Sequence, residues 1–167
     1  CRRQRQMCIR DRAKQIAEEA GVGLRSFFRH FEDMEALLEA VDQQARQHYE
    51  HLFLLPKPDG DIEARLSDYI DVLSNAFERL KRPMLSTQFH MWQSRGLQNN
   101  WARNQRRLRK HLEHWVPELQ TLPDARREAV HAVTSFDMWH RLRHHQSLSI
   151  NDAREAMLAL MLGVLNN

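Results

Sequence analysis

Residues that break helices are scarce in this chain. Only five glycines and five prolines interrupt its 167 residues, and the apolar patterns between them run well past the length of a strand. The longest apolar run, Ala156–Leu165, covers about half the span that a membrane helix needs. The two cysteines, Cys1 and Cys8, lie close together at the start, which excludes a disulfide framework across the fold. We therefore predict an all-α protein in the cytoplasm, with no membrane segment.

The positive charge is concentrated at the start of the chain. Residues 1–31 contain eight Lys or Arg and three Asp or Glu, so they carry a charge of +5, while the whole chain carries +3. The remainder is therefore slightly acidic. A basic head on an acidic body favours a polyanion as the partner of the head. A charged tail in solvent would produce the same totals.

Two short helices joined by a tight turn are predicted near the start. The apolar residues of the first helix fall on one stripe: Ala13, Ile16, Ala17 and Ala20. Gly21 then ends this helix as a left-handed cap, and the connection that follows is too short for anything but a sharp turn. The second helix, over residues 24–31, places Phe27 and Phe31 on its inner side. A DNA-binding helix-turn-helix needs this arrangement.

Longer helices are predicted after Phe31. They cover residues 32–55, 62–80, 84–94, 99–115, 124–145 and 149–165. The segment 56–60 is a loop, and Pro83 and Gly96 separate the helices on either side of them. The final helix is apolar on nearly every side, and a second subunit most easily covers such a surface. We therefore predict a homodimer whose interface includes Val133, His140, Met157, Leu160, Met161 and Val164.

Basic residues also gather on the predicted helix 99–115. They are Arg103, Arg106, Arg107, Arg109 and Lys110. Such a row fits a second nucleic-acid surface. Glu113 and Glu118 follow closely, however, and a solvated helix face explains the row better.

The string Ile16–Phe31, IAEEAGVGLRSFFRHF, resembles a known family signature. Together with Glu35-Ala-Leu-Leu38 it is similar to the pattern I-A-x-x-A-G-V-S-x-x-T-x-Y-x-H-F-x-x-K-E-x-L of the TetR-like bacterial transcription regulators. The stretch 135–150 resembles, more weakly, the end of that family's regulatory domain. The resemblance implies a homodimeric repressor whose heads bind the two halves of a palindromic operator in double-stranded DNA. It also implies a small-molecule effector that binds the body and releases the DNA.

The resemblance assigns DNA contacts to the second helix and to the residue before it. The residues are Gly23, Leu24, Arg25, Ser26, Phe28, Arg29 and His30. Leu24 and Arg25 stand where the family meets base edges, and an arginine suits the edge of guanine. Phe28, Arg29 and His30 stand at positions associated with the DNA backbone and the groove wall.

Departures from the family pattern concern phosphate contacts and the first helix. Gly23 replaces a capping serine, Phe28 lacks a tyrosine hydroxyl, and Met34 stands where lysine is usual. Each lowers affinity more than specificity, because phosphate contacts position the protein and base contacts specify the sequence. The family has a first helix before the segment that matches here from Ala13, whereas residues 1–12 show no apolar stripe.

The predicted domains follow from that comparison. We expect residues 1–12 to be a non-native or disordered peptide, residues 13–36 to form a head without its first helix, and residues 37–167 to form a ligand-binding and dimerisation domain. A head that lacks a third of its core leaves an alternative function. The chain is then a helical dimer that binds a small molecule and does not bind DNA.

Aromatic and methionine side chains on three helices are candidates for the effector pocket. They are Tyr69, Phe77, Phe89, Met91, Trp92, Phe136 and Trp139. The same helical spacing is also typical of ordinary core packing. If these side chains line a pocket, their crowding favours an apolar, in particular aromatic, effector.

Catalytic and metal-binding patterns are weak. His48 with His51, and His111 with His114, have the i, i+3 spacing that can place two imidazoles on one helix face. No further ligands complete a recognisable set, and surface histidines explain the pairs better. No strained, glycine-flanked turn of the kind that presents a nucleophile surrounds Ser86, Ser94 or Ser135. We predict no catalytic residue, metal or cofactor; a metal-dependent helical hydrolase is the remote alternative.

Overall fold

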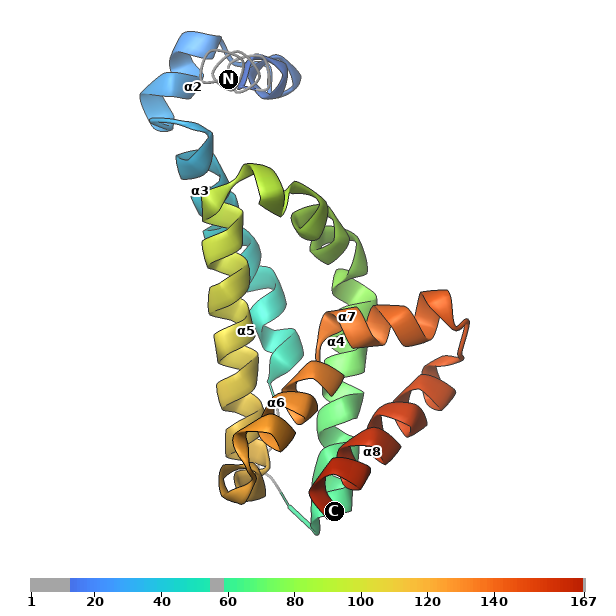
Figure 1. Cartoon of the computed structure of the whole chain (residues 1–167). Helices are drawn as coiled ribbons and strands as arrows, with labels where there is room; N and C mark the ends of the chain where they lie inside the picture. Colours follow the sequence, from blue (N-terminus) through green and yellow to red (C-terminus); the bar gives the residue numbers. More distant parts are fainter. Residues whose placement is uncertain (1–12, 55–58, 167) are drawn as a thin grey trace.

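The computed structural model describes residues 13–54 and 59–166, and this part of the chain is helical without strands (Figure 1). The prediction of an all-α fold is confirmed. Helical turns over residues 13–19 precede α2 (Leu24–His30), α3 (Met34–Tyr49), α4 (Ile62–His90), α5 (Arg95–Trp115), α6 (Asp124–Val133), α7 (Phe136–His140) and α8 (Ile150–Asn166). Shorter turns cover Glu50–Phe53, Met91–Gln93, Pro117–Thr121 and, as a π-helix, Arg141–His145. The peptide 1–12 lies outside the described residues.

The molecule has a small head and a larger body. The head, which contains α2, lies at one end of Figure 1, and α3 runs from it along α5 into the body. A small cluster of Ala13, Ala17 and Phe27 forms the core of the head. The main core lies between α4, α5, α6, α7 and α8. None of the helices in the described ranges is long and apolar enough to cross a membrane.

The predicted break at Pro83 does not occur. Pro83 lies inside α4, which continues to His90 and bends toward α5 in Figure 1. Proline removes one backbone donor and kinks a helix, and a sufficiently packed helix continues through the kink. The predicted stop at Gly96 is also wrong, since Gly96 lies in the first turn of α5 after the cap at Ser94.

The predicted single helix over residues 124–145 is divided. It breaks at Thr134 and Ser135, where α6 ends and α7 begins. The Thr134 hydroxyl donates to the Val130 carbonyl, and the Ser135 hydroxyl accepts from the Met138 amide as the cap of α7. Hydroxyl side chains can form hydrogen bonds with backbone groups in place of the regular hydrogen bonds of a helix. Two such residues in succession therefore allow the chain to change direction.

The last helix turns one apolar stripe inward. Ala153, Met157 and Met161 are buried against α4 and α6, and Val133 is also in the core. Three of the residues expected at a dimer interface, Val133, Met157 and Met161, thus lie inside the chain's own core. Leu160 is exposed, while Val164 and His140 are half-buried.

A reciprocal contact joins α4 to the end of α5. The Trp115 indole Nε1 donates to the Arg65 carbonyl at 2.6 Å, and Arg65 Nη1 donates to the Trp115 carbonyl at 3.0 Å. The Trp115 side chain is buried in the main core. The indole therefore combines apolar burial with a backbone hydrogen bond that a phenylalanine ring cannot form.

We predict that Trp115→Phe lowers the free energy of unfolding by about 1–3 kcal/mol, because the Arg65 carbonyl loses its buried donor. Urea unfolding followed by circular dichroism measures the change. Trp92→Phe is the matched control, since Trp92 is 74% exposed and its replacement should change stability by no more than about 0.5 kcal/mol. Equal stabilities for the two variants would contradict this account of the α4–α5 contact.

Candidate DNA-binding head and ligand cavity

The turn of the head depends on one backbone conformation. Gly21 has a φ of +66°, the left-handed region that favours glycine. This conformation lets the Val22 amide donate to the Ala17 carbonyl at 2.9 Å and closes the turn. Gly23 then caps α2 through its carbonyl alone, which accepts from the amides of Ser26 and Phe27. The absence of a side-chain cap follows from the replacement of serine by glycine.

The outer face of α2 carries the residues that the resemblance assigns to DNA. Arg25, Phe28, Arg29 and His30 are exposed. Leu24 and Ser26 are half-buried and border the same surface hollow as Arg25, Phe28 and Arg29. The inward side chain is Phe27, whose ring lies 5.2 Å from Phe28 and 5.6 Å from Phe31 between ring centroids. The helix thus packs against the head through Phe27 and exposes two arginines, one histidine and Phe28.

The charge of this face is positive and available. Arg29 and His30 lie in the last turn of α2, and its first turn has no acidic residue. Neither Arg25 nor Arg29 takes part in an ion pair with another described residue. Unpaired guanidinium groups on an exposed helix can bind phosphate or the edge of guanine.

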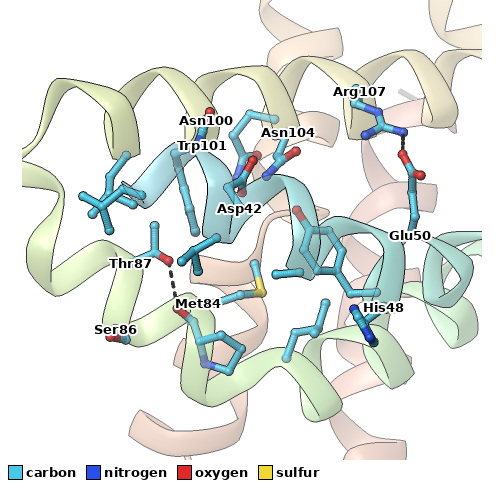
Figure 2. Close-up of a pocket in the computed structure, with 18 of the residues that line it drawn as sticks. Asp42, His48, Glu50, Met84, Ser86, Thr87, Asn100, Trp101, Asn104 and Arg107 are labelled. Atoms are coloured by element: carbon cyan, nitrogen blue, oxygen red, sulfur yellow. Dashed lines mark hydrogen bonds and ion pairs between the residues drawn. The ribbon is translucent and has the colours of Figure 1, made fainter. Parts of the chain in front are cut away.

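A large cavity lies in the body, between α3, α4 and α5 (Figure 2). Its volume is about 1450 Å³, and it extends from Ile16 and Asp33 of the head to His111 of α5. In Figure 2 the side chain of Trp101 projects from α5 and that of Met84 from α4 into the space between these helices. The apolar part of the wall also includes Leu38, Val41, Ala45, Phe53, Leu80, Leu97 and Leu108.

One wall of this cavity is α3. None of its residues 36–49 is buried, and Val41 is 53% exposed. The apolar stripe that predicts this helix faces the cavity through Leu38, Val41, Ala45 and Tyr49. The helix that leads from the head therefore has little core contact with the body.

Ion pairs connect α3 and the turn after it to α5. The Asp42 carboxylate accepts from Arg46 at 2.7 Å and from Arg103 at 3.2 Å. Glu50, in the turn after α3, pairs with Arg107 (Figure 2). The hydrogen bond from Arg107 lowers the pKa of Glu50, and the bond to Asp42 raises the pKa of Arg46. Each of these charges is therefore stabilised by its partner.

The basic row of α5 has a structural role. Arg103 and Arg107 hold the α3 region, and Arg109 pairs with Glu128 of α6. These three arginines thus link helices of the body, which accounts for them without a second nucleic-acid surface. At the same end of the cavity, burial and the nearby Arg107 lower the pKa of His111. Its imidazole is therefore mainly neutral at pH 7.

The aromatic residues expected in the pocket lie elsewhere. Tyr69, Phe77, Phe136 and Trp139 are buried in the main core; Phe89 and Trp92 are more than 70% exposed, and Met91 is half-buried. None of these seven residues lines the cavity. Periodicity identifies an apolar stripe but does not distinguish a stripe that packs from one that lines a space. The missed signal is the row Asn100, Asn104 and Arg107, which adds polar groups beside the apolar row of α5.

The paired histidines do not complete a metal site. His48, His51 and His111 line the cavity, whereas His114 does not. Within residues 13–54 and 59–166, no three His, Cys, Asp or Glu side chains are grouped so that they could hold a metal ion.

Comparison with known families matches the head. Residues 12–41 match the family model of the bacterial regulatory proteins of the tetR family. No curated protein and no solved structure matches the chain. The matched span includes the helix-turn-helix and the first half of α3, which are the elements on which the outward face of α2 depends.

We predict that Asp42→Asn loosens α3, because Arg46 and Arg103 lose the carboxylate that holds them. Hydrogen exchange of the amides of residues 36–49 should become about tenfold faster, as expected for the loss of a charged hydrogen bond. Asp68→Asn is the matched control, since Asp68 is exposed on α4 and forms no ion pair with a described residue. Unchanged exchange in α3 would show that other contacts hold the helix.

Proposed function

We propose that this chain, whose residues 12–41 match the bacterial regulatory proteins of the tetR family, is a repressor that a small molecule releases from its operator. The observation that carries the proposal is that α3 connects the head to the cavity. This helix continues directly from the head, and its apolar side is a wall of the cavity. A molecule that fills the cavity therefore contacts the element that orients α2.

DNA binding is assigned to the exposed face of α2. Arg25 reads a base edge in the major groove, where an arginine can donate two hydrogen bonds to guanine. Arg29 and His30 contact the DNA backbone, and Leu24, Ser26, Phe28 and the backbone at Gly23 complete the surface. Arg25 and Arg29 form no ion pair with another described residue, which supports this assignment, because no such pair has to break before they bind DNA.

The control step follows from the weak attachment of α3. None of residues 36–49 of this helix is buried, so it can shift against the body at a lower cost than a helix in the core. A ligand between α3, α4 and α5 favours the α3 position that fits the ligand best. Operator affinity falls if that position differs from the DNA-bound one.

We further propose that the protein acts as a homodimer on a palindromic operator in the cytoplasm. The exposed Leu160 on α8 supports an apolar contact with a second copy, and the half-buried Val164 lies one turn further along the same helix. His140 of α7 is half-buried and stays a proposed interface residue. A twofold dimer presents two copies of α2 to the two halves of the operator. No catalytic role and no cofactor are part of the proposal.

Replacement of the base-reading arginine tests the DNA-binding part. Arg25→Ala should weaken binding to an operator selected from random duplexes by about 1–3 kcal/mol, which is roughly 5- to 150-fold. Fluorescence anisotropy at two salt concentrations measures it. Arg79→Ala, an exposed arginine of α4, is the matched control and should bind as the parent protein does. The DNA-binding proposal fails if the parent protein shows no salt-sensitive specific binding, or if Arg25→Ala binds equally well.

A cavity-filling variant tests the control step. Ala45 is exposed on the cavity side of α3, so Ala45→Trp places an indole in the space without compressing the core. We expect operator affinity to fall about fivefold or more, within the usual range of allosteric coupling. Ala125→Trp on the exposed side of α6 is the control. If Ala45→Trp binds the operator with the affinity of the parent protein, filling the cavity does not control DNA binding, and this part of the proposal fails.

A further inference from the structure

The wall that α5 contributes to the cavity has two chemically different rows. Leu97, Trp101 and Leu108 form an apolar row, and Asn100, Asn104 and Arg107 form a polar row beside it. The polar residues are spaced i, i+4 and i+7, so they follow one side of the helix. A ligand in the cavity therefore meets a mainly apolar surface with a polar edge.

The charged groups along this edge already have partners. Asp42 is bound by Arg46 and Arg103, and Glu50 is bound by Arg107. At the head end of the cavity, Asp33 accepts from the Ala36 amide as the cap of α3. An ionic ligand would have to separate an existing pair or enter without a counter-charge, and burial of an unpaired charge is costly. At Asp42, Glu50 and Arg107 the cavity therefore disfavours ionic ligands.

The two asparagines have hydrogen-bonding capacity that the protein does not use. Asn100 is only 4% exposed, and its Oδ1 accepts from Arg103. Because arginine only donates hydrogen bonds, this contact fixes the amide with Nδ2 on the other side. The Nδ2 donor is buried without a partner among the described residues. A buried donor left without a partner costs about 1–3 kcal/mol.

Asn104 lies one turn further along α5 on the same cavity wall. Its side chain is half-buried and forms no hydrogen bond with any described residue. It can donate and accept, because its amide carries both an NH₂ group and a carbonyl oxygen. The two side chains together provide neutral donors and one acceptor beside the apolar row of α5.

We infer that the cavity binds an uncharged, mainly apolar molecule with a carbonyl or amide group, and that Asn100 and Asn104 bind this group. The inference rests on the proposed function, because it takes the cavity as the effector site. The apolar part of the ligand lies against Trp101, Met84 and Leu108. The carbonyl oxygen accepts from the asparagine donors, and the existing ion pairs between α3 and α5 remain intact.

The test uses the full chain and displacement of N-phenyl-1-naphthylamine, an uncharged fluorescent probe. The competitors have chains of similar length and differ in the head group: decanamide, undecane, decanoate and decylamine. We expect decanamide to bind most tightly. Asn104→Leu and Asn100→Leu should each weaken decanamide about five- to tenfold, as expected for one lost hydrogen bond, and change undecane less than twofold. Asn99→Leu, on the exposed side of the same helix, should change neither competitor.

Asn100→Asp distinguishes a role of Asn100 in ligand binding from a structural role through its hydrogen bond with Arg103. It keeps an oxygen for Arg103 and removes the NH₂ donor, so decanamide should weaken as in Asn100→Leu while the thermal midpoint stays close to that of the parent protein. The inference is wrong if decanoate binds more tightly than decanamide, or if decanamide binds equally well to the parent protein and to Asn104→Leu. Either result leaves the proposed function intact. If the probe does not bind, or if Ala45→Trp does not reduce its binding, the cavity is not a ligand site. The effector part of the proposed function then also fails.

Discussion

The attachment of α3 to α5 is the contact on which the link between head and body depends. Asp42 with Arg103, and Glu50 with Arg107, join the two regions, while none of residues 36–49 is buried. Partly exposed ion pairs contribute little stability compared with a packed apolar face. The head is therefore carried by a helix whose position changes at modest cost. A rigid core on the other side of the cavity, formed by α4 to α8, provides the fixed reference for such a change.

The head and the body are packed differently. The head has only a small cluster around Phe27, so the precise turn at Gly21 determines how α2 is presented. The body buries large side chains such as Trp115 and Trp139, and polar contacts also complete their packing: the Trp139 indole donates to Glu78 at 3.0 Å. A stable body with a lightly attached head suits a regulator, because ligand binding then changes orientation without loss of the fold.

Short-range sequence preferences predicted the helices and the turn of the head well, whereas they predicted the residues that line the cavity poorly. The helix at residues 24–31 and the left-handed glycine at position 21 follow from short-range steric preferences, which tertiary contacts did not override. The break at Thr134 and the continuation through Pro83 depend on how neighbouring helices pack, which one sequence does not specify. The cavity was missed for a similar reason: Val41 and Phe77 are both apolar residues at helical spacing, yet Val41 faces a space and Phe77 fills the core. The amides at positions 100 and 104 became informative only when the structure placed them on the same wall.

We propose that cavity occupancy and operator binding oppose each other through α3. Linkage requires that a ligand which weakens DNA binding is itself weakened by DNA to the same extent. The most direct measurement is therefore the dissociation constant of N-phenyl-1-naphthylamine for the free protein and for the protein saturated with operator DNA. We expect a dissociation constant at least about fivefold higher on the DNA complex. Equal constants in the two states would contradict it.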